Sequence, residues 1–495
     1  MNILIDIIKL LAESIVEAFS IAINLLKKDH SYKGRYGNWR QILKKRHKQN
    51  GIAIGDRFIS LKESLNGGMM LLGKTGIGKS SKIFKMLLFK AENSNSSFVN
   101  LDVAGDIRED CYYPIVEKFG YKEEILNFSD ASKSTVTWNP IEDLPYEKVN
   151  RFSNDLVVIN MNSENSKDPI WSLMSATLIG IIIRVLKRID LKEYINLFNT
   201  RFLIKVLQSE PKKIDALVSK YADDSLFLNY RAFLNNEDRF LNSVLSNTLA
   251  VLQQWEDPNI IKVTSSSSLD MDSYREEKKV LYLQNDVMAQ SYLASLNSLF
   301  FTSWFSHITS YIPNSNDDNV IVFGIDEASS LKMKKDLIPL VVSQLRKHLS
   351  YGIWGYQSYS QVQDLLGFQG AETLRQNTGT ILYLGNQDLD TGTRISRSLG
   401  RYTYDKEDRE SVRELLTPEE AMYLDDSKQG GILFSGQNRP MKLKRIKAFY
   451  EIPKYKKWAE MPAKPIPQMH HDMPPLLPID SLLPELENQT QVNEN

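Results

Sequence analysis

The sequence predicts an α/β fold whose mostly parallel sheet is interrupted by an all-helical insertion. The prediction rests on short apolar runs that alternate with helical periodicity, and on a glycine-rich loop between one such run and a helix. Between about 145 and 260 the periodicity is helical throughout. The expected segments are an N-terminal helix with a basic linker (1–50), the first part of the sheet domain (51–145), the all-α insertion (146–260), the second part of the sheet domain (261–455) and a proline-rich disordered tail (456–495).

The expected strands are short apolar runs, and most of them are bounded by polar or glycine residues. They cover residues 68–72, 97–102, 280–283, 320–325, 352–356, 380–384 and 431–434. A helix is expected over 80–92, with Ile83, Met86 and Leu87 on its inner face. Continuous apolar strands are typical of a parallel sheet that helices cover on both faces.

The composition limits the classes of function. The chain has 495 residues and no net charge, with 61 basic and 61 acidic side chains, whereas proteins that coat duplex DNA are usually basic. Any contact with nucleic acid must therefore come from a local patch or a pore. The single cysteine, Cys111, excludes an internal disulfide and a zinc finger, and it fits a reducing cytoplasm.

Residues 1–28 are expected to form one amphipathic helix with a broad apolar face. Four charges line a narrow stripe of it: Asp6, Lys9, Glu13 and Glu17. The longest charge-free run after Glu17 is Ala18 to Leu26, well short of the roughly 20 apolar residues of a membrane span. No clear transmembrane span is expected. Docking on another subunit or on a membrane protein is favoured over a helix lying in the membrane interface, because the polar stripe is mixed rather than basic.

The glycine-rich loop carries the strongest chemical signal. Residues 73–80 read Gly-Lys-Thr-Gly-Ile-Gly-Lys-Ser, which matches the whole P-loop pattern after a strand and before a helix. Lys79 is expected to reach the β- and γ-phosphates, and Ser80 to bind Mg²⁺. The predicted ATP and Mg²⁺ site contains Gly73, Thr75, Gly76, Gly78, Lys79, Ser80, Ser81 and Asp326. Whether the nucleotide is ATP or GTP is left open, because the backbone contacts of a P-loop bind the phosphates and do not distinguish the bases.

An acidic pair supplies the carboxylates that a P-loop site needs. Asp326 and Glu327 directly follow the apolar run 320–325. Asp326 is expected to position the Mg²⁺ ion, and Glu327 to orient or deprotonate the attacking water. The alternative is a surface acidic pair at a strand end, which the presence of the P-loop disfavours.

Polar residues near the next strand complete the predicted catalytic set. Gln357 ends the strand expected to lie between the P-loop strand and the acidic strand, so it can contact the γ-phosphate or the water. Arg346, eleven residues upstream, is a candidate arginine finger that enters a neighbouring subunit's site, and Arg375 is its rival. A polar strand cap and solvated arginines are the alternatives.

A lysine loop follows the acidic pair and is the candidate DNA contact. Lys332, Lys334 and Lys335 lie close to the catalytic carboxylates, so movement there can follow the nucleotide state. A solvated helix start is the competing interpretation, since lysine runs are commonly just that.

The order and spacing of further motifs resemble conjugative coupling proteins of the TraG/TraD type. After the P-loop come Asp102-Val-Ala-Gly105-Asp106, Trp138-Asn139-Pro140, Asp168-Pro-Ile-Trp171, Asp326-Glu327, the glutamine motif Tyr351 to Gln361, Thr391 to Gly400, and Leu416-Thr-Pro-Glu-Glu420. The likeness covers about residues 50–450. Ala104 stands where the family has lysine, which removes the basis for a phosphate or DNA contact there.

The resemblance implies a RecA-like motor domain with an all-α domain, assembled as a homo-hexamer. It implies an ATPase that feeds DNA, single-stranded and bound to a relaxase, to a type IV secretion channel. Typical members begin with transmembrane helices, whereas this chain begins with the segment 1–28. A cytoplasmic motor that docks at the inner face of the cell membrane is therefore expected.

Three other functions share these motifs. A DNA translocase of the HerA/FtsK type would differ only in its partner. A secretion ATPase that acts on proteins is a different class, and the lysine loop favours DNA over it. A nucleotide-gated receptor that docks cargo without pumping is disfavoured by Glu327, because a switch does not need a hydrolytic base.

Overall fold

A nine-stranded sheet forms the centre of the protein. In this computed structural model the described residues are 34–161, 169–314, 318–406, 409–424 and 430–483. The strand order is β13-β12-β9-β3-β8-β7-β4-β6-β5, and the strands from β9 to β5 run parallel. Their bounds are β3 Met69–Leu72, β4 Ser96–Leu101, β5 Lys122–Asn127, β6 Lys279–Gln284, β7 Val320–Ile325, β8 Ser350–Tyr356, β9 Thr380–Leu384, β12 Gly431–Ser435 and β13 Met441–Leu443.

Helices cover both faces of the sheet, as expected for continuous apolar strands. Alternate residues of β3 show the two faces, because Met69 and Leu71 pack with one buried cluster and Met70 and Leu72 with the other. One face carries α3 (Lys85–Phe89), α4 (Asp106–Tyr112) and α18 (Pro453–Ala459). The other carries α13 (Gln290–Ile308), α14 (Leu337–Gln344) and α15 (Tyr359–Asn377).

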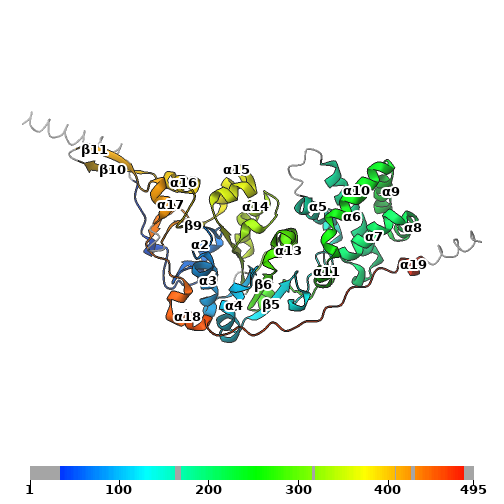
Figure 1. Cartoon of the computed structure of the whole chain (residues 1–495), viewed down its shortest axis with the longest axis horizontal. Helices are drawn as coiled ribbons and strands as arrows, with labels where there is room; N and C mark the ends of the chain where they lie inside the picture. Colours follow the sequence, from blue (N-terminus) through cyan, green and yellow to red (C-terminus); the bar gives the residue numbers. More distant parts are fainter. Residues whose placement is uncertain (1–33, 162–168, 315–317, 407–408, 425–429, 484–495) are drawn as a thin grey trace, which may run out of the picture.

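The insertion forms a separate helical domain beside the sheet domain (Figure 1). Its helices are α5 Val149–Met161, α6 Ile170–Ile189, α7 Leu197–Ser209, α8 Pro211–Tyr221, α9 Asp224–Leu234, α10 Asp238–Val251 and α11 Pro258–Thr264. Among the described residues only α6 is long and apolar enough to cross a membrane. More than half of its most apolar stretch is buried inside the protein, which is typical of a bundle core helix.

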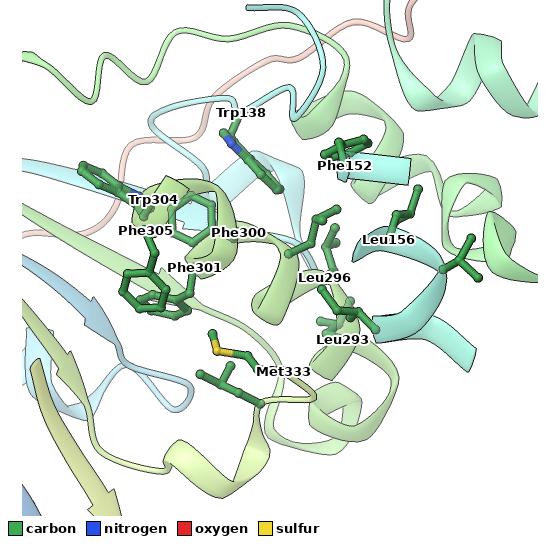
Figure 2. Packing of buried hydrophobic residues seen from close by; sticks show 14 of the residues in the cluster. Trp138, Phe152, Leu156, Leu293, Leu296, Phe300, Phe301, Trp304, Phe305 and Met333 are labelled. Carbon is green, nitrogen blue, oxygen red and sulfur yellow. The ribbon is translucent and has the colours of Figure 1, made fainter. Parts of the chain in front are cut away.

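Helix α13 joins the two domains. Its ring of Phe305 packs against Phe323 of β7 with centroids 5.0 Å apart, and Phe300 packs edge-on against Trp138 at 5.1 Å. Figure 2 shows its Leu293 and Leu296 directed toward α5. Side chains are buried around most of this helix, so the sheet and the insertion share one hydrophobic cluster.

Smaller elements surround this frame, and the sequence did not predict them. They are β1 Asn50–Ile54, β2 Arg57–Ser60, α2 Leu61–Leu65, α12 Ser273–Glu276, α16 Leu389–Leu399, β10 Arg401–Lys406, β11 Arg409–Glu414, α17 Pro418–Tyr423 and α19 Ile479–Leu482. Strands β5 and β13 were also not expected. β5 begins with a charged Lys-Glu-Glu run and therefore lacks the apolar pattern used for the others.

The proline-rich tail differs from its prediction, because residues 456–483 are not disordered. After α18 the chain runs extended beneath the sheet domain and reaches the helical domain at α19 (Figure 1). Trp458 packs against Tyr113 and Phe119, while Leu477 and Ile479 are buried. Composition predicts no independent core, and the described part of the tail, residues 456–483, packs its apolar side chains on the two domains instead. We call residues 460–483 the strap.

The N-terminal helix predicted over 1–28 lies outside the described residues.

Candidate functional site

The glycine-rich loop connects β3 to the helix that begins at Ser80. Gly76 and Gly78 have φ angles of +83° and +91°, a region that side chains other than glycine rarely adopt. A Cβ at Gly78 would also lie 3.0 Å from side-chain atoms of Ser81 and Lys82. The helix starts with a widened π turn, Ser80–Phe84, before α3. The loop therefore ends at a helix N-terminus, where backbone N–H groups can bind an anion.

The Lys79 side chain folds back and contacts the glycine-rich loop from which it comes. Its Nζ donates a hydrogen bond of 2.7 Å to the carbonyl oxygen of Gly73, and the side chain is buried. Burial lowers the pKa of Lys79, while Asp326 and Glu327 act in the opposite direction. A buried ammonium whose partner is one loop carbonyl is a strong binding group for a phosphate.

Ser80 and Asp326 form the part of the site that fits Mg²⁺. The Ser80 hydroxyl donates to Oδ2 of Asp326. Oδ1 of Asp326 is buried and lacks a hydrogen-bond partner within the described chain. Burial raises the pKa of Asp326 to about 6. Such an orphaned oxygen beside a hydroxyl matches the hard oxygen ligands that Mg²⁺ prefers, with substrate phosphates completing the set.

Glu327 and Gln357 meet across neighbouring strands. β8 lies between β3 and β7, so Gln357 at its end faces the residues that follow β7. Nε2 of Gln357 donates to Oε1 of Glu327 at 3.1 Å. The sequence placed Gln357 near the phosphate or the water, whereas here its side chain holds the carboxylate.

These groups line one cleft of about 1100 Å³ at the carboxyl edge of the sheet. It includes Thr75, Gly76, Gly78, Lys79, Ser80, Ser81, Asp326, Glu327 and Gln357, all of them expected from the sequence. Gly73 contributes through its carbonyl oxygen, which holds Lys79. The short turn before α13 and the start of α13 form another wall of the cleft, through Val287, Gln290 and Ser291.

Several residues of this cleft are not among those expected from the sequence. Asp102 accepts hydrogen bonds from the backbone N–H groups of Ile107 and Arg108, and burial raises its pKa to about 7. Asp106 pairs with Lys85 at 2.7 Å. Because Asp102 follows β4, which ends at the same edge as β7, strand order could have located it. Ala104 also lines the cleft and supplies no charge.

The structure does not bring the candidate arginine fingers into this cleft. Arg346 lies before β8, at the opposite end of that strand from Gln357, and it donates to Oδ1 of Asn66 at 3.1 Å. Arg375 pairs with Glu372 at 3.0 Å. Neither lines the cleft of its own chain as far as the structure describes it, so a role for either requires a neighbouring subunit.

The three lysines of the candidate DNA loop have different surroundings. Lys332 is exposed and lies at the cleft. Lys334 forms an ion pair of 2.5 Å with Asp155 of α5, and Lys335 is half-buried. The loop therefore contacts the helical domain as well as the cleft.

Fold and cleft together define a RecA-like P-loop protein with an all-α insertion. Residues 27–470 match the family described as Type IV secretory system Conjugative DNA transfer. The chain belongs to this family, which confirms the resemblance to conjugative coupling proteins.

Two curated relatives come from different bacteria. VirD4 of Rhizobium radiobacter is 23% identical over 406 residues, which cover 76% of this chain and 56% of VirD4. The coupling protein TraD of Escherichia coli (strain K12) is 23% identical over 349 residues, 68% of this chain and 44% of TraD. The chain thus spans about half the length of the curated relatives it matches.

Solved structures of the coupling protein TrwB share the fold. TrwBΔN70 in complex with sulphate has a TM-score of 0.62 at 18% identity, covering 90% of this chain and 99% of that one. TrwB in complex with ADP and Mg²⁺ has a TM-score of 0.60 at 18% identity, covering 87% and 92%.

Proposed function

We propose that this chain is an ATP-hydrolysing motor that moves DNA into a type IV secretion channel. The observation that carries the proposal is the meeting of Lys79, the Ser80–Asp326 pair and the Glu327–Gln357 pair in one cleft. Binding alone needs only the first two groups. Hydrolysis also needs a group that activates the attacking water, and the carboxylate held beside these two groups supplies it.

Nucleotide binding follows from the loop and Lys79. The backbone N–H groups of residues 76–80 receive the phosphates, and the Lys79 ammonium exchanges the Gly73 carbonyl for phosphate oxygens. Ser80 and Asp326 would hold Mg²⁺, and the ion would supply positive charge against the β- and γ-phosphates. TrwB has been solved with an ATP analogue and with a GTP analogue, so the choice of base needs a direct test.

Hydrolysis follows from Glu327. A water oxygen forms a bond to the γ-phosphorus while the bond to the bridging oxygen of ADP breaks. The proton of the water passes to the Glu327 carboxylate, and ADP and phosphate leave. Gln357 keeps that carboxylate at the carboxyl edge of the sheet through the 3.1 Å hydrogen bond.

The proposed cargo is single-stranded DNA with its relaxase, delivered at the inner face of the cell membrane to channel components. The family description, conjugative DNA transfer, supports this choice over a protein-only cargo. The loop with Lys332, Lys334 and Lys335 is the proposed DNA contact, with the exposed Lys332 as its leading group.

The proposed assembly is a homo-hexamer with the cleft between neighbouring subunits. Large apolar side chains are exposed near the cleft, where a neighbour would cover them. Met288 is 91% exposed and Val287 55% exposed in the short turn Val287–Ala289 that precedes α13, and Phe368 of α15 is 67% exposed. Among the described residues that line the cleft there is no arginine, so a finger would come from the neighbour.

ATPase assays test the function. We expect hydrolysis of ATP that rises several-fold with single-stranded DNA and falls as salt increases, because phosphate contacts release counterions. Stimulation by an unfolded protein substrate in place of DNA would move the assignment to a protein-secretion ATPase. Nucleotide binding without turnover would identify a gated receptor instead.

Mixing two inactive variants tests the assembly. Arg346→Ala leaves the chain's own cleft intact, so each subunit should bind ATP yet fail to hydrolyse it. Mixed with Lys79→Ala subunits, it should regain part of the activity, since each variant supplies the other's missing half of a shared site. No recovery in verified co-assemblies would transfer the role to Arg375.

A further inference from the structure

The carboxylate of Glu327 is held by two donors at the same oxygen. Nε2 of Gln357 and Oγ of Ser329 each lie 3.1 Å from Oε1. Gln357 reaches it from the end of β8, and Ser329 from the short turn Ala328–Ser330 that follows β7. The two donors therefore approach from two different elements of the sheet edge.

Two donors at one oxygen restrict the carboxylate. The terminal torsion of a glutamate side chain is broad, so a single contact leaves the carboxylate free to rotate. A second donor from another direction fixes its plane. With Oε1 occupied by both donors, Oε2 is the oxygen left to take up the proton of the attacking water.

Both donors are themselves held in place. The backbone N–H of Gln357 donates to Oε1 of Gln361 at 2.9 Å, which fixes the end of β8. The turn that carries Ser329 is anchored by Ala328, which is fully buried, and closed by the hydroxyl of Ser330, which donates to the backbone oxygen of Glu327 at 2.7 Å. Ser329 and Ser330 are thus adjacent hydroxyls with different partners, one on the carboxylate and one on the backbone.

We propose that Ser329 is a positioning residue for hydrolysis: its hydroxyl, together with Gln357, orients the Glu327 carboxylate so that Oε2 accepts the proton of the attacking water. This inference rests on the proposed ATPase function. Ser329 acts through Glu327, and neither the nucleotide nor the water needs to touch it.

The variant pair Ser329→Ala and Ser330→Ala separates this role from a general effect on the turn. Ser329→Ala should lower kcat for ATP roughly 10-fold and leave KM unchanged. The loss is smaller than the rate enhancement of a general base, because Glu327 is still present but less well oriented. Ser329→Thr should restore most of the rate because it returns a hydroxyl at the same position. Ser330→Ala loosens the turn but leaves both donors on the carboxylate, so it should lose less of kcat than Ser329→Ala. An equal or larger loss in Ser330→Ala would mean that the turn as a whole, and not the Ser329 hydroxyl, sets the rate.

A double-variant cycle shows whether Ser329 acts through Glu327. Under single-turnover conditions, Ser329→Ala should cost little further rate in a Glu327→Gln background, because the group it orients is already gone. An equal loss in both backgrounds would mean that Ser329 acts directly on water or phosphate, and the proposal would be wrong. A Ser329→Ala variant as fast as the parent, beside a slow Glu327→Gln variant, overturns this proposal alone. A fast Glu327→Gln variant overturns the proposed function.

Discussion

At the residue scale, Lys79 and Glu327 lie in one cleft, and the proposed function gives them different steps. Lys79 is buried and directed at the loop that would hold phosphates, so its removal affects the bound state and the transition state alike. Glu327 is the proposed base for the attacking water, and Gln357 holds its carboxylate. Binding and turnover should therefore respond differently to the two substitutions.

Lys79→Ala should weaken ATP affinity by about 10- to 100-fold, the usual cost of losing a charged hydrogen bond. Glu327→Gln should keep ATP affinity within a few-fold and lower kcat roughly 100-fold or more, because only the activation of water is lost. Equilibrium binding of ATP and steady-state kinetics of both variants check this. Wild-type turnover in Glu327→Gln would show that the base lies elsewhere.

Mg²⁺ binding should depend on pH through Asp326. Burial raises the pKa of Asp326 to about 6, and a protonated carboxyl does not hold the metal. The Mg²⁺-dependent part of ADP affinity should therefore be complete above that pH and fall about tenfold per unit below it. Calorimetric titrations across this range, with ADP alone as the control, measure the effect. A Mg²⁺-dependent affinity that stays constant down to pH 5 would contradict it.

At the element scale, the sequence predicted what depends on local pattern. The strand before the P-loop, the helix after it and the strand before Asp326 were located within a few residues, because each is an uninterrupted apolar run next to a distinctive loop. It missed β5 and the β10–β11 hairpin, whose charged strands are specified by their pairing partners. The partner of β5 is β6, about 150 residues further along the chain, and a single sequence does not reveal such a pairing. The β10–β11 hairpin is local, but its strands are rich in charged residues and lack the apolar runs from which the other strands were predicted.

The residues of the cleft likewise fall into two groups, those that a local motif predicts and those that only the fold brings there. The P-loop and the acidic pair follow from contiguous motifs, whereas Asp102 and Ser329 enter the cleft through strand order and a turn. The ion pair between Lys334 and Asp155 was also hidden, because it joins the sheet domain to the insertion. For that reason the lysine loop needs a control that separates DNA contact from domain contact.

Replacing Lys332, Lys334 and Lys335 by alanine should weaken binding to single-stranded DNA and flatten its salt dependence by about 0.7 per lost phosphate contact. Asp155→Asn is the matched control, because it breaks the ion pair with Lys334 but retains all three lysines. Fluorescence anisotropy at several salt concentrations gives affinity and slope, with ATP affinity measured in parallel. If Asp155→Asn reproduces the loss, the loop acts through the domain joint rather than on DNA.

At the scale of the whole molecule, the strap ties the helical domain to the sheet domain. Near its start, the carbonyl oxygen of Lys464 accepts from Arg108 at 2.9 Å. At its far end, the buried amide of Asn199 donates to the carbonyl oxygen of Pro475 at 3.1 Å and accepts from the N–H of Leu477 at 2.9 Å. The Asn199 side chain thus forms hydrogen bonds with two backbone groups of the strap. These bonds hold the extended segment in place although it has no regular secondary structure there.

Asn199→Ala should destabilise the helical domain by about 1–3 kcal/mol, because it leaves the buried N–H of Leu477 without its partner. Asp480→Ala is the control, since it removes only an exposed ion pair with Lys213 and should change stability little. Denaturant unfolding of the full chain compares the two variants. Equal stability of both variants and the parent would show that the strap does not hold the domain.

The proposed function requires that ATP hydrolysis in this cleft moves DNA. The most direct measurement is the rate at which the chain displaces streptavidin from biotinylated single-stranded DNA, because displacement requires force along the strand and not binding alone. We predict displacement that requires ATP and Mg²⁺, depends on the free length of the strand and is absent in Glu327→Gln, which still binds ATP and DNA. Hydrolysis that DNA stimulates without any displacement, or displacement that Glu327→Gln performs equally well, would contradict the account.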